Sequence, residues 1–155
     1  MWRDATAAAR AAEKDGTTMQ GRIVVARATG DILRDKYKAT IQAGHHRIIA
    51  DEAPQLGGAD TGPSPYELLL SGLAACTLIT LRMYADRKQW AIDSLHVELR
   101  YTREAAIARI DRTIIVSGAI GEAERTRLAE IAEKTPVTLT LKSGVAIETQ
   151  LQAGG

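Results

Sequence analysis

The segment 65–88 constrains the fold of this chain more than any other, because it reads as a long helix that is apolar nearly all round. Ser64 can cap the helix, Pro65 suits its first position, and Glu67 completes a capping box. A helix without a broad polar face must be covered on most sides. Its apolar positions are Leu68, Leu69, Leu70, Leu73, Ala74, Ala75, Leu78, Ile79 and Leu81.

The rest of the chain is too small to surround that helix easily. The chain has 155 residues, which is one ordinary domain. A helix from 65 to 88 would be about 36 Å long, more than a monomer of this size covers easily. We therefore expect a second copy of the chain to cover part of it, which predicts a homodimer.

Around this helix the pattern predicts an α+β domain with a mainly antiparallel sheet. We expect a single domain over residues 21–155, preceded by an N-terminal extension, 1–20, that is either a short helix or mobile. The segment 29–31 reads as a turn, 52–64 as a loop and 122–133 as an amphipathic helix stopped by Pro136. Alternation or β-branched character predicts strands over 23–26, 36–43, 47–51, 95–101, 110–120 and 145–151.

Composition excludes several classes of function. Twenty basic residues face nineteen acidic ones, a net charge of +1 that does not indicate a nucleic-acid partner. No uninterrupted apolar run approaches the roughly 18 residues that span a membrane, so no membrane partner is expected. One cysteine excludes an intrachain disulfide and a cysteine-based zinc site, and fits a reducing cytoplasm. We expect neither a metal nor a bound cofactor, since His45 and His46 are neighbours in a strand context and no phosphate-binding glycine loop occurs.

Cys76 is the single candidate for thiol chemistry, and two interpretations of it stay open. A cysteine among Leu and Ala on an apolar helix is often a small buried hydrophobe. A reactive thiolate at this position would need a cation from another element or another subunit, because the start of its own helix is too far away. Glu67 precedes Cys76 by nine positions, which is two and a half turns of helix. The two side chains therefore point to opposite sides of the helix.

The residues around Cys76 match a known family. The run Leu-Gly-Gly-Ala-Asp-Thr-Gly-Pro-Ser-Pro-Tyr-Glu from Leu56 to Glu67, followed by Leu73-Ala-Ala-Cys-Thr, resembles the first motif of the OsmC/Ohr family. The later Leu128-Ala-Glu-Ile-Ala-Glu-Lys-Thr-Pro-Val resembles its second motif. The resemblance implies an intertwined homodimer in which sheets enclose the central helices. It also implies thiol-dependent reduction of organic hydroperoxides, an activity of oxidative-stress defence.

The resemblance assigns roles to particular residues. Cys76 stands at the peroxide-reactive cysteine, and its thiolate would attack the peroxide oxygen. Arg34, followed by Asp35, stands like the family's Arg-Asp pair and would stabilise the thiolate and orient the peroxide. Glu67 stands at the helix-start glutamate that partners the arginine. The small apolar hydroperoxide would occupy a pocket lined by Leu69, Leu73 and Met83.

The chain departs from the family at Thr135, where the second, resolving cysteine belongs. Thr138-Leu139 also replaces the histidine-arginine that usually follows. Without a second thiol, the oxidised Cys76 would need an external thiol reductant. Two other interpretations remain: a non-catalytic protein of the same fold that binds a small apolar ligand, with Cys76 structural, and a redox sensor that forms an intermolecular disulfide.

Overall fold

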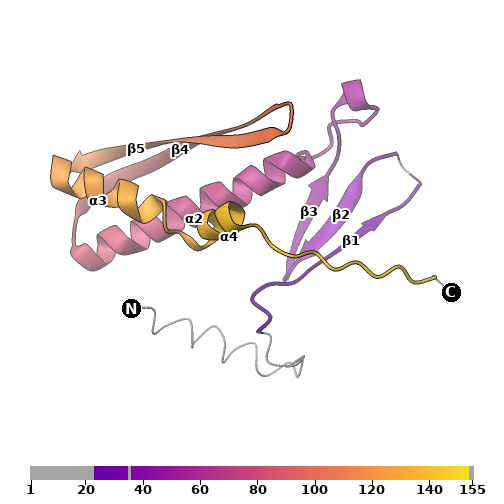
Figure 1. Ribbon diagram of the computed structural model, residues 1–155, viewed down its shortest axis with the longest axis horizontal. Helices are drawn as coiled ribbons and strands as arrows, with labels where there is room; N and C mark the ends of the chain where they lie inside the picture. The colour runs from indigo at the N-terminus through magenta and orange to yellow at the C-terminus, as the bar shows by residue number, and fades with distance from the viewer. Residues whose placement is uncertain (1–22, 35, 154–155) are drawn as a thin grey trace. The chain divides into compact units, whose positions relative to one another are not determined.

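The computed structural model describes residues 23–34 and 36–153, which form two compact units (Figure 1). The first unit ends at Pro65 and the second begins at Tyr66. The expectations for residues 1–20 and for Asp35 lie outside the described residues. That residues 21–155 form a single domain stays a prediction. The α+β class and the antiparallel pairing of every described strand are confirmed.

The first unit is a three-stranded antiparallel sheet in the order β1-β2-β3. Its strands are β1 (Ala28–Ile32), β2 (Ala39–Ala43) and β3 (His46–Ala50). The predicted turn at 29–31 lies inside β1, and the strand predicted at 23–26 is not formed. Pairing with β2 extends the Thr-Gly-Asp segment in spite of its turn preference, with Gly30 opposite Ile41.

A buried carboxylate organises the loop after β3, which contains the 3₁₀ turn η2 (Pro54–Leu56). Asp51 is only 3% exposed. Its oxygens accept the N–H groups of Glu52 at 2.8 Å, Ala59 at 3.2 Å and Thr61 at 3.1 Å, and the Thr61 hydroxyl at 2.8 Å. The loop closes so tightly that a Cβ on Gly58 would lie 1.8 Å from the Glu52 carbonyl oxygen, which only glycine avoids.

The second unit is built on α2 (Pro65–Lys88), whose bounds are those the sequence predicts. Gln89 takes a left-handed conformation, φ 55°, just after the last helical residue. Its N–H donates to the Asp86 carbonyl at 3.1 Å, and the Trp90 N–H donates to the Ala85 carbonyl at 3.0 Å. This pair of bonds is a Schellman motif, which satisfies the last carbonyls and ends the helix.

A long hairpin follows α2, formed by β4 (Ala91–Glu104) and β5 (Ile107–Ala119). Near its open end Gly118 has φ 130°, and a Cβ there would lie 2.2 Å from the Ala91 carbonyl oxygen. The predicted helix α3 (Glu122–Ala132) comes next, and then α4 (Pro136–Ser143), which the sequence analysis missed. Pro136 ends one helix but also starts another, because proline is favoured at the first helical position. The strand predicted over 145–151 is not formed, and these residues are exposed.

One stripe of α2 anchors the second unit. The stripe consists of Leu73, Thr77, Leu81 and Ala85, the buried residues of the helix. Its C-terminal half packs with Ile92 of β4 and with α3. Figure 1 shows α2 running alongside the β4–β5 hairpin. The core cluster is Leu81, Ala85, Ile92, Leu128 and Ala132, bordered by Tyr84, Trp90, Leu95, Ile114, Val116, Ile120 and Ile131.

The other side of α2 is not covered within this chain. Ile79 is 59% exposed and Met83 is 50% exposed. By length and composition α2 could cross a membrane, with a mean hydropathy of 1.6 over its most apolar window, although its apolar run is interrupted. The core helix of a globular protein passes the same test. Within this chain 22% of that window is buried, which includes the stripe described above.

Asp51 generates a pH-dependent prediction. Hydrogen bonds from the Thr61 hydroxyl and backbone lower the pKa of Asp51 from 3.8 to about 2. Because the pKa of the folded protein lies below that of the unfolded chain, the stabilisation is complete above about pH 4 and is lost as the pH falls through about 2.

We expect Asp51→Asn to lower the melting temperature at pH 7, because its amide NH₂ would face N–H donors. The difference from the natural protein should shrink between pH 4 and pH 2. Asp60→Asn is the matched control in the same loop, since Asp60 is exposed and asparagine tolerates its φ of 54°. Equal melting temperatures for Asp51→Asn and the natural protein at pH 7 would contradict this account of the loop.

Candidate functional site

Cys76 lies in the middle of α2, half-buried, and meets the start of α4. The backbone N–H of Val137 donates to Cys76 Sγ at 3.5 Å. Val137 is the second residue of α4, after the N-cap Thr135 and Pro136. The first N–H groups of a helix have no acceptor within the helix, and the positive end of its dipole favours a negative charge. The sulfur therefore accepts one of the N–H groups at the start of α4.

A buried arginine joins α2, β5, α3 and α4 beside this contact. The side chain of Arg112, from β5, is 10% exposed. Its Nη1 donates to Thr77 Oγ1 at 3.0 Å and to Thr138 Oγ1 at 2.9 Å. Its Nη2 donates to the Ala132 carbonyl at 3.0 Å and to Glu133 Oε1 at 3.0 Å. Four acceptors thus occupy the two terminal nitrogens, and they hold the guanidinium in one orientation.

The hydroxyl groups around Arg112 form a connected chain. Thr77 Oγ1 donates to the Leu73 carbonyl at 2.7 Å, so it is free to accept from the arginine. Thr138 Oγ1 donates to the Ala132 carbonyl at 3.2 Å, and Thr135 Oγ1 lies 2.7 Å from Thr138 Oγ1. In the described chain no buried side-chain nitrogen or oxygen lacks a partner. The network is therefore fully satisfied, which is the condition for a polar cluster in a core.

The acidic member of this cluster is Glu133. It binds the ammonium group of Lys142 as well as Arg112. The hydrogen bond from Lys142, followed by that from Arg112, lowers the pKa of Glu133, against the opposing effect of burial. The carboxylate therefore stays ionised at neutral pH and balances part of the positive charge.

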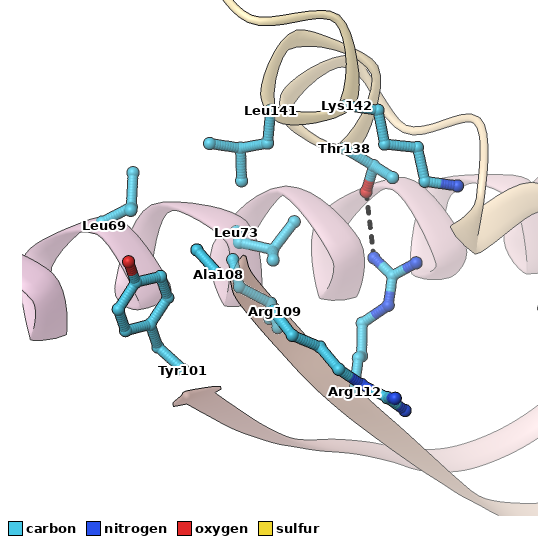
Figure 2. A pocket seen from close by; sticks show the side chains of 10 residues that line it. Leu69, Leu73, Tyr101, Ala108, Arg109, Arg112, Thr138, Leu141 and Lys142 are labelled. Carbon is cyan, nitrogen blue, oxygen red and sulfur yellow. Dashed lines mark hydrogen bonds between the residues drawn. The ribbon is translucent and has the colours of Figure 1, made fainter. Parts of the chain in front are cut away.

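A cavity of about 380 Å³ opens between α2, the hairpin and α4 (Figure 2). Tyr101 stacks on Tyr66, with ring centroids 4.5 Å apart, and interaction with the Tyr66 hydroxyl raises the pKa of Tyr101. Figure 2 shows Arg112 reaching Thr138 beside this space. The cavity is apolar apart from three cations and two hydroxyls, and its lining residues are Leu69, Leu73, Tyr101, Ala108, Arg109, Ile110, Arg112, Thr138, Leu141 and Lys142.

The structure brings some of the predicted site residues together. Leu69 and Leu73 line the cavity, and Leu73 lies one turn before Cys76. Met83 does not line it and lies half-exposed further along α2. Glu67 is exposed in the first turn of α2.

Two further predicted positions fall in different units: Thr135 lies beside Cys76 in the second unit, and Arg34 belongs to the first unit. Arg34 is exposed in the first unit, where its carbonyl accepts the Lys36 N–H at 3.0 Å. Thr135 is buried at the start of α4, two residues before the amide that contacts Cys76.

Sequence reasoning missed Arg112 and the Val137 amide. A signal for Arg112 was present, because it occupies an inward position of β5 between Ile110 and Ile114. A charged residue on the apolar face of a strand indicates a buried polar partner. The Val137 amide had no comparable signal, because backbone contacts leave no mark in side-chain patterns.

No metal cluster accompanies the thiol. In the part of the chain that the structure describes, no group of three or more His, Cys, Asp or Glu side chains could hold a metal ion. The strand interpretation predicted that His45 and His46 face opposite sides, and this is wrong. His45 is a turn residue, and the two ring centroids are 3.9 Å apart.

Comparison with known proteins identifies relatives of this architecture. The family model for OsmC-like protein matches residues 57–150. An OsmC-like protein from Mycoplasma pneumoniae has a TM-score of 0.67 at 24% identity, covering 80% of this chain and 89% of its own. An organic hydroperoxide resistance protein OsmC from Legionella pneumophila has a TM-score of 0.58 at 16% identity, covering 78% and 91%.

A third solved structure carries a ligand. A putative organic hydroperoxide resistance protein from Vibrio cholerae, with captopril bound in one of its active sites, has a TM-score of 0.58 at 14% identity, covering 81% and 89% of the two chains. At these identities the three structures establish the fold. No curated protein matches the chain.

The network around Arg112 predicts a specific loss of stability. Arg112→Lys keeps the charge but replaces a planar fork with one ammonium group, which cannot reach all four acceptors. We expect the free energy of unfolding in urea to fall by about 1–3 kcal/mol.

Arg109→Lys is the matched control, because Arg109 is exposed on the same strand and pairs with Asp111. That change should cost less than about 0.5 kcal/mol. Equal effects of the two substitutions would contradict the role given to the network.

Proposed function

Because this chain belongs to the OsmC-like protein family, we propose that it is a thiol-dependent peroxidase that reduces organic hydroperoxides through Cys76. The observation that carries the proposal is the hydrogen bond from the Val137 N–H to Cys76 Sγ at the start of α4. A thiol becomes a nucleophile as its thiolate, and a helix N-terminus is one of the environments that favour this form. Family membership supports a role in oxidative-stress defence.

The reaction uses one thiol of the protein and two external thiols. The Cys76 thiolate attacks the peroxide oxygen, the O–O bond breaks, and the organic oxygen leaves with a proton as an alcohol. Cys76 is then a sulfenic acid. One external thiol displaces water from it and forms a mixed disulfide, and a second releases Cys76 as a thiol. The sum is one hydroperoxide and two thiols giving one alcohol, one disulfide and water.

The need for an external reductant follows from Thr135. The position at which a resolving cysteine is expected holds a threonine, whose hydroxyl is bound to Thr138 at 2.7 Å. A hydroxyl cannot form a disulfide with a sulfenic acid. A pool of small or protein thiols is therefore part of the proposal, and such a pool is maintained in the cytoplasm, where we place the protein.

The cavity supports an apolar substrate. Leu69, Leu73, Ile110 and Leu141 contribute aliphatic walls next to the helix turn that holds Cys76. We propose that this space receives the organic group of the hydroperoxide. No bound cofactor is needed, because the sulfur itself carries the two electrons.

A cation must still orient the peroxide. The terminal nitrogens of Arg112 are engaged with four acceptors, so this residue is not available for the task. We propose Arg34 as the cation and Glu67 as its carboxylate partner, the roles that the family resemblance implies. In a dimer either residue could come from the same chain or from the partner.

A second function has one observation in its favour. Cys76 does not itself line the cavity, whereas Leu73 and Thr138 do. A protein that binds a small apolar ligand without chemistry would have this arrangement, with the cysteine as a packing residue. Such a protein would bind the ligand equally well without the thiol.

Turnover measurements distinguish the two functions. With cumene hydroperoxide and dithiothreitol, we expect the natural protein to release cumyl alcohol and Cys76→Ser to lose at least about a hundredfold in rate, because removing the nucleophile removes the covalent step. Melting temperature serves as the folding control for the variant. Full alcohol production by a folded Cys76→Ser protein would overturn the peroxidase proposal.

We also propose a homodimer in which a second copy covers the exposed side of α2, including Ile79 and Met83. Burying such side chains supplies the apolar area that a stable interface needs. Light scattering should give a mass of twice 16.7 kDa. A mass of 16.7 kDa at micromolar concentration would contradict the dimer.

A further inference from the structure

We infer that Arg112 is a positioning residue for the thiol: it fastens the turn of α2 that carries Cys76 to the turn of α4 that carries Val137. This inference rests on the proposed function for its catalytic meaning. The link itself rests on geometry, because the contact between Cys76 and Val137 lies beside a second connection between the same two helix turns. Cys76 meets Val137, and their chain neighbours Thr77 and Thr138 both bind Arg112 Nη1.

The link is rigid at both ends. Thr77 is fully buried, and its hydroxyl is fixed by the Leu73 carbonyl at 2.7 Å. Thr138 is buried in the first turn of α4, and its hydroxyl is fixed by the Ala132 carbonyl and by Thr135 Oγ1. Each threonine can therefore accept from Arg112 in only one direction. The two turns are thus linked through one guanidinium nitrogen, which donates to the two threonine oxygens at 3.0 and 2.9 Å.

The contact with sulfur has no such support of its own. Sulfur is a weak acceptor, and the N–H···S contact is 3.5 Å long. The eight-residue helix α4 is joined to α3 by a short connection; Thr138 binds Arg112 at its first turn, and Lys142 binds Glu133 at its last turn. When the anchor at Thr138 is removed, the start of α4 can shift by a few tenths of an ångström. The N–H and the dipole then no longer point at the sulfur.

Arg112 does not act on the peroxide directly. Its side chain is buried, and both terminal nitrogens donate to protein acceptors. Glu133, at the end of α3, forms an ion pair with Arg112 and another with Lys142. Its influence on the reaction therefore passes through Thr77 and Thr138.

Thr138→Val tests the link, because valine has the same shape and lacks the hydroxyl. Thr138→Ser keeps the hydroxyl and should behave like the natural protein. Thr140→Val makes the same change at an exposed position of α4 and controls for helix propensity. The readout is the rate at which iodoacetamide alkylates Cys76 at pH 7 and at pH 9, followed by intact mass.

We expect Thr138→Val to raise the ratio of the pH 9 rate to the pH 7 rate about threefold to sixfold, because one lost hydrogen bond to a thiolate makes the thiol about a tenfold weaker acid and the thiolate fraction then falls at both pH values. A looser α4 would also make the sulfur more accessible to iodoacetamide. That change affects the rates at pH 9 and pH 7 equally, so it does not alter their ratio. Thr138→Ser and Thr140→Val should stay within about twofold of the natural protein. An unchanged ratio in folded Thr138→Val would overturn the inference.

A second variant covers the case in which Thr138→Val does not fold. Thr77→Val removes the other end of the link without touching α4, and the same increase in the ratio is expected. Alkylation needs no peroxide, so the two proposals fail separately. A changed ratio in a protein that turns over no hydroperoxide would refute the proposed function and leave the positioning role standing. An unchanged ratio with full peroxidase activity would refute the positioning role and leave the proposed function standing.

Discussion

The burial of one stripe of α2 is the constraint on which the second unit depends. Leu73, Thr77, Leu81 and Ala85 follow one another at intervals of four, so they form a single line along the helix. Packing the far half of that line against Ile92 and α3 fixes the rotation of the helix about its axis. Once that rotation is fixed, the position of every other side chain of α2 follows, including the sulfur.

Thr77 is the exception within this stripe, and it explains the polar cluster. A hydroxyl in an apolar stripe must find partners, and a buried guanidinium must find several more. The two requirements are met together, because Arg112 donates to Thr77, to Thr138 and to two acceptors at the end of α3. A buried charge of this kind adds little net stability but permits few alternative arrangements. Its consequence here is a defined position for the start of α4.

The sequence was sufficient for features that repeat or that have local signals. The length of α2 could be predicted from its cap and its apolar pattern, and the β4–β5 hairpin from alternation. The helix α4 could not, because the threonines between Pro136 and Ser143 favour a strand locally and become helical through buried contacts of Thr138. The strand β1 was missed for a related reason, since only its pairing with β2 extends it.

The candidate site was predictable in part for the same reasons. Cys76 is conspicuous as the single cysteine, and Leu69 and Leu73 follow from its helix. The partner of the sulfur is a backbone amide, which side-chain patterns do not encode. Its position results from the long-range contacts of Arg112, 35 residues along the chain from Thr77.

The central claim is that Cys76 reacts with organic hydroperoxides as a single thiol. The most direct test is to titrate the reduced protein with cumene hydroperoxide in the absence of reductant and to follow Cys76 by mass spectrometry. The account predicts loss of one thiol per chain, with sulfenic acid as the first product and no intrachain disulfide. A Cys76 thiol that stays unmodified at millimolar peroxide would contradict it.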